Sequence, residues 1–150
     1  MTKLLLLIAS LAVALPITSA MSAETAGTIK NVKGTVTIQR GSEKIAAKPG
    51  AGVATADRIA TGADGSVGII LRDNTLLSAG PNSTVVLERF AFDSTTHAGE
   101  LDASVKRGTL AVVSGKIAKQ SPGAVQFRTP NAILGVRGTE FVIDAGPGEE

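Results

Sequence analysis

The chain has 150 residues, with 15 Lys and Arg against 13 Asp and Glu, and it contains no cysteine. The absence of cysteine excludes disulfides, thiol catalysis, thiolate metal sites and cysteine-held iron–sulfur clusters. The near-balanced charge, with four Phe and no Trp or Tyr, argues against a nucleic-acid surface, which needs a dense basic cluster and aromatic stacking residues.

The first 23 residues have the three-part pattern of a secretory signal peptide. Lys3 gives a basic start, residues 4–15 form a twelve-residue apolar core, and Pro16 is followed by small residues. A membrane span needs about 20 apolar residues, so this core favours cleavage, after Ala20 or Ala23, over an uncleaved anchor. A buried N-terminal helix is the alternative. We therefore expect a periplasmic protein whose mature chain has no transmembrane anchor.

The rest of the chain is expected to form one domain. Residues 24–146 are enough to form one hydrophobic core that stabilises a domain, and they are too few for two such cores. Residues 147–150 are predicted to be a disordered tail.

Alternating apolar and polar residues predict strands at 28–33 and 35–40, with Ile29, Val36 and Ile38 facing inward. Gly41-Ser42 is a two-residue turn into a short strand at 43–47. Small residues dominate from Gly50 to Gly65, which predicts a loop with a short strand at 58–60.

The middle of the chain continues this pattern of strands and turns. Strands are predicted at 66–72, 75–79, 84–92, 100–106, 109–114 and 124–128. Asp73-Asn74 turns the first of these into the second. The polar segment from Asp93 to Gly99 is predicted to be a loop with His97 exposed in it, and residues 116–123 form another polar loop.

Short strands with turn residues between them, and no helical window after residue 23, predict an all-β protein. The expected architecture is a β-sandwich or β-roll of about ten short strands. A single-sheet solenoid is the alternative.

The segment from Thr129 to Asp144 is the most informative part of the sequence. Pro130 excludes a helix at its start, and two glycines interrupt an apolar strand pair between Ile133 and Ile143. Arg137 lies between the glycines, and its permanent charge needs water or a partner. It either pairs with an acid such as Glu140 or Asp144 and closes the fold, which we favour, or it contacts another protein.

This segment resembles the closing motif of the FecR domain. The motif positions, which we expect to be mainly structural, are Thr129, Pro130, Gly135, Val136, Arg137, Gly138, Thr139 and Phe141. Upstream pieces are also similar to the family: 27–29, 32–36, 57–62, 70–75 and 105–110. Two positions depart from its pattern, because Ala56 and Asn74 stand where glycine is usual. Asn tolerates left-handed backbone best among non-glycine residues, so its turn should be preserved.

The resemblance implies a periplasmic, β-rich module of envelope signalling. The family's full-length regulators sense a transporter's signalling domain and control a sigma factor across the inner membrane. These 150 residues show no counterpart of the anti-sigma segment or the membrane span, so we expect the periplasmic recognition part at most.

We expect a non-enzymatic protein-interaction module without cofactor or metal, whose partner is an unidentified envelope protein and not a nucleic acid. Asp57, Asp64 and Asp73 are interpreted as turn-capping residues. The surface offered to the partner is a strand edge or the loops Pro81–Ser83 and Asp93–Gly99. A cell-wall or glycan-binding or structural envelope module is the alternative, although scarce aromatic residues argue against sugar stacking.

Overall fold

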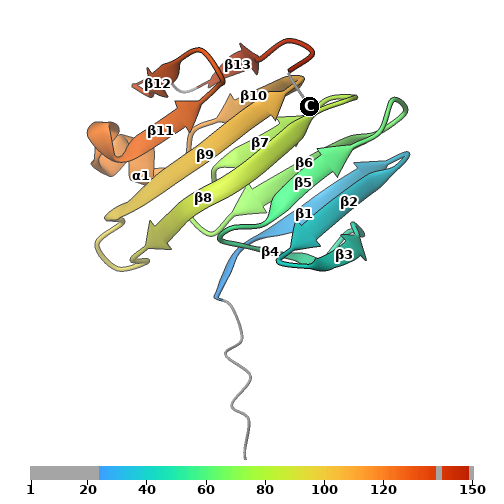
Figure 1. Ribbon diagram of the computed structural model, residues 1–150. Coiled ribbons are helices and arrows are strands. Elements are labelled where there is room, and N and C mark those ends of the chain that lie inside the picture. The colour runs from blue at the N-terminus through green and yellow to red at the C-terminus, as the bar shows by residue number, and fades with distance from the viewer. Residues whose placement is uncertain (1–23, 138–139, 149–150) are drawn as a thin grey trace, which may run out of the picture.

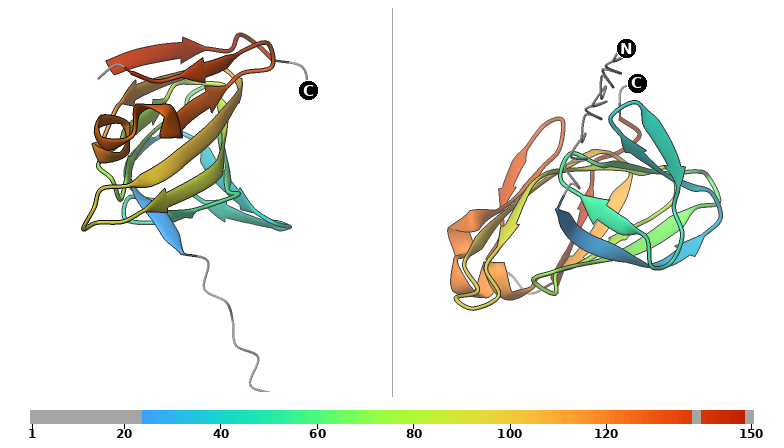
Figure 2. Two further views of the ribbon diagram at one scale, coloured as in Figure 1. Left: turned by 90° about the vertical axis from the view of Figure 1, so that its left-hand side faces the viewer. Right: turned by 90° about the horizontal axis from the view of Figure 1, so that it is seen from below.

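The computed structural model describes residues 24–137 and 140–148, which form two β-sheets packed face to face (Figures 1 and 2). The strands of sheet A, in spatial order, are β13 (Glu140–Asp144), β10 (Thr109–Val113), β7 (Leu76–Ala79), β6 (Ser66–Leu71), β1 (Thr25–Lys33) and β4 (Gly52–Ala54). The strands of sheet B are β12 (Ile133–Gly135), β11 (Val125–Arg128), β9 (Gly99–Arg107), β8 (Thr84–Phe92), β5 (Arg58–Thr61), β2 (Val36–Arg40) and β3 (Glu43–Ala46). The all-β prediction is confirmed, and the non-sequential strand order rules out the solenoid.

Turn chemistry sets where the chain reverses or changes sheet. Gly34, at φ 62°, lies between β1 and β2, and a Cβ there would meet the backbone of Asp64. The chain therefore leaves sheet A for sheet B at a position that only glycine fits. Gly41 and Ser42 form the predicted two-residue turn, since Arg40 and Glu43 are paired across it.

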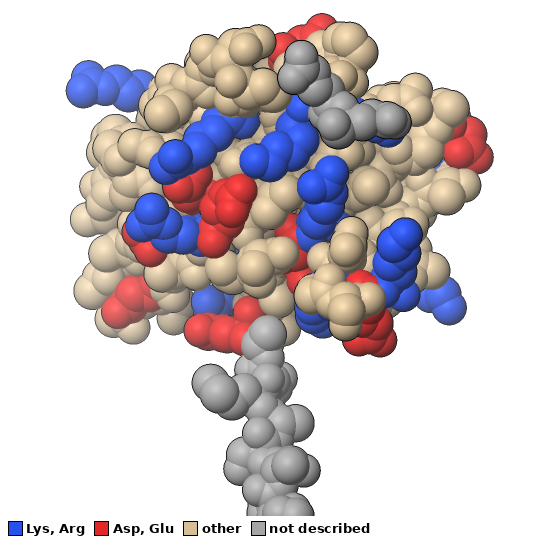
Figure 3. All heavy atoms as spheres, viewed as in Figure 1, with Lys and Arg blue, Asp and Glu red and all other residues tan. Residues whose placement is uncertain are grey.

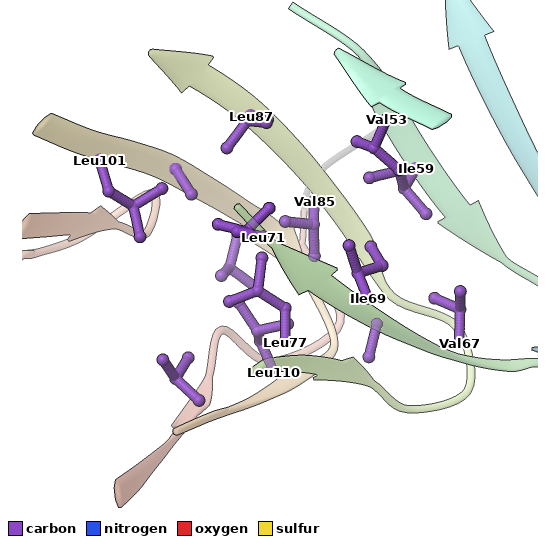
Figure 4. Packing of buried hydrophobic residues seen from close by; sticks show 14 of the residues in the cluster. Val53, Ile59, Val67, Ile69, Leu71, Leu77, Val85, Leu87, Leu101 and Leu110 are labelled. Carbon is purple, nitrogen blue, oxygen red and sulfur yellow. The ribbon is translucent and has the colours of Figure 1, made fainter. Parts of the chain in front are cut away.

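The core lies between the sheets and receives alternate residues from both (Figure 4). Sheet A contributes Ile69, Leu71, Leu77 and Leu110, and sheet B contributes Ile59, Val85, Leu87 and Leu101, all buried. Ile29, Val36 and Ile38 are buried as predicted. One continuous cluster spans both sheets, so the described residues pack as one unit.

Two elements differ from the sequence prediction. β4 is a three-residue strand paired with β1, in a stretch whose small residues predicted only loop. Residues Lys116–Gln120 form the short helix α1, followed by the 3₁₀ turn η1 (Pro122–Ala124), where a polar loop was expected. The described residues contain thirteen strands, where about ten were expected. Both elements are too short to carry a periodic signal, and their tertiary partners hold them.

The C-terminal strands are not paired with each other. β12 pairs with β11 at the edge of sheet B, whereas β13 pairs with β10 at the edge of sheet A. Beyond β13, Gly108 donates to the carbonyl of Gly146 at 2.8 Å, and Gly148 lies against Arg107. The expected disordered tail thus contacts the domain at its first residues. The predicted signal peptide lies outside the described residues.

Within the described ranges, α1 has five residues, and none of the helices is long and apolar enough to span a membrane.

Candidate functional site

The predicted family motif begins in a tight hairpin between β11 and β12. The Thr129 amide donates to the carbonyl of Ala132 at 2.9 Å, and Pro130 is exposed in the turn. β12 then runs antiparallel to β11, with Gly135 opposite Gln126. The prediction that Pro130 starts a turn and not a helix is confirmed.

Val136 marks the point where the chain leaves sheet B. Its side chain is buried in the core, and its amide donates to the carbonyl of Val125 at 3.3 Å. The chain enters sheet A at Glu140. Gly138 and Thr139 lie outside the described residues, so the roles expected for them stay predictions.

Phe141 anchors the start of β13. Its half-buried ring meets the buried ring of Phe127 edge to face, at 5.5 Å between centroids and 74° between planes. Aromatic pairs favour this geometry. The contact holds the first part of β13 against a strand of the other sheet.

The expected ion pair of Arg137 is not seen among the described residues. Arg137 is exposed, and neither Glu140 nor Asp144 forms a salt bridge with it. An exposed guanidinium keeps its hydration, so it needs no carboxylate from this chain. Arg137 is therefore accessible to another molecule.

A buried ion pair does exist, and it involves residues that the sequence did not bring together. Asp57 is fully buried and accepts from Arg40 Nε at 2.8 Å, from Arg40 Nη2 at 2.7 Å and from the Ala54 amide at 2.8 Å. These bonds to Asp57 raise the pKa of Arg40. A buried aspartate needs a cation or several hydrogen-bond donors around it. This requirement is the signal by which the sequence could have pointed to a partner for Asp57.

Among the described residues, three of the four large exposed apolar side chains lie on the two C-terminal edge strands, and the fourth is Val113 of β10. Val142 of β13 is 69% exposed, and Ile133 and Leu134 of β12 are 66% and 37% exposed. Figure 1 shows β12 and β13 at the same end of the sandwich. A shallow groove of about 330 Å³ lies there, and its lining includes Leu134, Arg137 and Phe141.

The two loops predicted to face a partner do not form one surface. Pro81–Ser83 precedes β8 and Asp93–Gly99 follows it, so a nine-residue strand of about 30 Å separates them. Ser83 is buried, and its Oγ donates to the carbonyl of Thr109 at 3.1 Å. Ser83 therefore has a structural role, and the two loops form no joint surface; contact of either loop with a partner stays a prediction.

The Asp93–Gly99 loop is ordered by its own hydrogen bonds. Asp93 Oδ1 accepts from the amides of Thr96 and Thr95 at 3.1 and 2.8 Å, and these bonds lower the pKa of its carboxyl. The pKa of Asp93 is thus lower in the folded state than in the unfolded state. The stabilisation of the fold by these bonds is complete above the unfolded-state pKa and is lost as the pH falls through the folded-state pKa. His97 is half-buried and stacks on Phe92 at 6.1 Å, instead of being simply exposed.

Of the three aspartates interpreted as turn-capping residues, Asp73 caps its own turn, whereas Asp64 bonds a residue distant in sequence and Asp57 forms the ion pair with Arg40. Asp73 accepts from the amide of Thr75 at 3.1 Å, and Asp64 accepts from the amide of Thr35 at 3.3 Å. Across the described ranges, no three His, Asp or Glu side chains gather closely enough to hold a metal ion. The candidate site combines the apolar edge strand β12, the exposed Arg137 and the edge strand β13, on which Glu140 and Asp144 are exposed.

Comparison with curated proteins and with solved structures gave no match. Residues 57–149, well over half of the chain, match the family described as FecR protein, a family of signalling regulators. The match starts at the buried Asp57 and includes every motif position from Thr129 to Phe141, whereas the similar pieces before Asp57 lie outside it. The chain therefore belongs to the FecR family.

Proposed function

We propose that this chain is an exported, non-enzymatic FecR domain that binds an extended segment of another envelope protein at the β12–β13 end. The observation that carries the proposal is the exposure of Ile133 and Val142 on adjacent ends of two sheet edges. Exposed apolar edge strands are usually blunted by charge or cover. The edge strand β12 carries no charged residue, so it suits a partner strand.

Strand addition explains how such a surface would bind. Edge strands have backbone N–H and C=O groups that an added strand pairs with, and alternate side chains of that strand enter pockets. The groove beside Leu134 and Phe141 would take an apolar side chain. Arg137 would meet a carboxylate of the partner, because its guanidinium donates in a planar fork.

Site-specific photo-crosslinking in living cells tests the proposal. A photoreactive residue replaces Ile133 in the full chain, and a matched one replaces Lys44 on β3, the edge of sheet B farthest from β12. We expect one envelope protein to be captured from position 133 and not from position 44. The intact mass of the uncrosslinked protein should show a start near Met21 or Glu24, as export predicts.

Two substitutions of Arg137 separate an effect on binding from an effect on folding. Arg137→Glu should reduce capture at position 133, while Arg137→Ala should alter the free energy of unfolding by only about 0–1 kcal/mol, since Arg137 is exposed. Equal capture from both positions would contradict the proposal. Retention of the protein on peptidoglycan, without any protein adduct, would favour the glycan-binding alternative.

A further inference from the structure

The outer face of sheet A is uncharged across three neighbouring strands, β10, β7 and β6. Residues alternate between core and solvent along β10, β7 and β6, and none of their outward positions carries a charge. These outward residues are Ser66, Gly68, Ile70, Leu76, Ser78, Thr109, Ala111 and Val113. The outer face of sheet B is the opposite: Figure 3 shows basic and acidic side chains spread over it.

Strand register arranges these residues in rows across the sheet. One row runs through Val113, Leu76 and Ile70, which are apolar and at least partly exposed. The next row runs through Ala111, Ser78 and Gly68, which are small. A hollow of about 340 Å³ lies over part of these rows. The face thus has a row of large apolar side chains beside a row of small ones. Another flat surface can approach the row of small side chains closely.

The charges of this face lie on its two flanks and have opposite signs. Glu140 and Asp144 point outward from β13, whose Phe141 and Ile143 face the core. Lys30 and Lys33 lie on β1 at the other flank, where Lys33 is paired with Ser66 and Lys30 lines the hollow. In the order β13-β10-β7-β6-β1-β4, β7 lies two strands from the acidic β13 on one side and two strands from the basic β1 on the other.

We propose that the outer face of sheet A binds a second copy of this chain, around a two-fold axis that runs along β7. Rotation about that axis lays β13 of one copy over β1 of the other, so Asp144 meets Lys33 twice. Leu76 would face its own counterpart, and Ala111 would face Gly68. An axis across the strands would instead place β13 on β13, acid against acid, so the charges select the first arrangement.

The size of the face sets the expected affinity. Five strands about 4.8 Å apart span about 20 Å, which is small for a protein interface, so the dimer should be weak, with a Kd on the order of 10 to 100 μM. This inference does not rest on the proposed function, because it uses the outer face of sheet A and not the strand β12 of sheet B. Val142, which points outward from β13, would be covered in such a dimer.

Sedimentation equilibrium of the mature protein, over a concentration range that brackets this Kd, tests the proposal. Ser78→Lys places two like charges on the axis at an exposed position, so it should raise the dimer Kd at least about tenfold and leave the fold intact. Thr37→Lys, on the outer face of sheet B, is the matched control and should leave the Kd unchanged. Circular dichroism checks that both variants fold.

A charge exchange tests the orientation of the copies. Lys33→Glu should weaken the dimer by roughly fivefold, because two attractive pairs become repulsive, and adding Asp144→Lys should restore the affinity. A wild-type protein that stays monomeric throughout the range would overturn the proposal, as would equal effects of Ser78→Lys and Thr37→Lys. If the double variant does not regain the affinity of the wild-type dimer, the proposed axis is wrong. None of these outcomes depends on capture of a partner at β12.

Discussion

Two non-glycine residues with left-handed backbone show how single positions store strain in this domain. Ala56 has φ 71° and Asn74 has φ 68°. The Ala56 amide donates to the carbonyl of Leu87 at 2.7 Å, which holds the loop before β5 in that conformation. Alanine adopts it at a cost of about 1–2 kcal/mol, whereas asparagine is more tolerant.

We predict that Ala56→Gly raises the free energy of unfolding by about 1 kcal/mol, because glycine removes the Cβ strain. Asn74→Gly should change it by less, since asparagine already tolerates φ 68°. Urea denaturation of the two variants and the parent measures the difference. A loss of stability in Ala56→Gly would show that unfolded-state entropy outweighs the strain at this turn.

The buried carboxylate of Asp57 gives a second prediction for a single residue. Asp57→Ala leaves Arg40 and the Ala54 amide without their acceptor, and breaking a buried pair costs about 3–5 kcal/mol. The Arg40 side chain is 41% exposed and can be rehydrated, so we expect a loss of about 2–3 kcal/mol.

Glu24→Ala is the control for this measurement, since Glu24 forms an exposed pair with Arg72 that should contribute roughly 0–1 kcal/mol. Thermal or urea unfolding compares the two variants. Equal effects would mean that the buried pair contributes no more than a surface pair.

At the scale of elements, one buried hydroxyl joins the β6–β7 turn to the start of α1. Thr75 Oγ1 donates to Asp73 Oδ2 at 2.7 Å and accepts from the Gly115 amide at 3.1 Å. Asp73 in turn accepts from the amide of Ile117 at 3.4 Å. The helix is therefore held by a turn about 40 residues earlier in the chain.

We predict that Thr75→Val lowers the free energy of unfolding by about 1–3 kcal/mol, because it keeps the shape but leaves the buried Gly115 amide unpaired and removes one of the two donors to Asp73 Oδ2. Thr37→Val, on a half-buried outer position of β2, should stay within about 0.5 kcal/mol. Hydrogen exchange should localise the effect to residues 115–117. Uniform exchange changes across both sheets would argue against this local link.

Elements defined by local chemistry could be predicted from the sequence. The strand at 84–92 has the predicted bounds, and the Gly41-Ser42 turn joins two strands as expected, because alternation and turn residues are properties of neighbouring positions. β4 and α1 could not be found, since each is held by contacts with residues distant in sequence.

The same limit explains the candidate site. The sequence drew attention to Arg137, but spacing does not say which acid lies opposite a given arginine. The buried pair instead joins Arg40 to Asp57 across β2 and β5. The separation of β12 from β13 into different sheets is likewise a property of the whole topology.

At the scale of the whole molecule, charge is distributed unevenly between the faces. A formal charge of +2 suggests an ordinary surface. In the structure, the outer face of sheet B is charged (Figure 3), whereas the outer face of sheet A is uncharged across β10, β7 and β6. Net charge predicts solubility, but only the fold shows which surfaces are suited to contact with proteins.

The placement of the last two strands has a consequence for biosynthesis. β12 completes one sheet and β13 the other, and both come from the end of the chain. Neither sheet therefore gains the strand at this edge until residues 133–144 are available to fold. Until then the edges of β11 and β10 stay unpaired, and unpaired strand edges favour association with other chains. A single proteolytic cut before β12 would leave both edges without their strands.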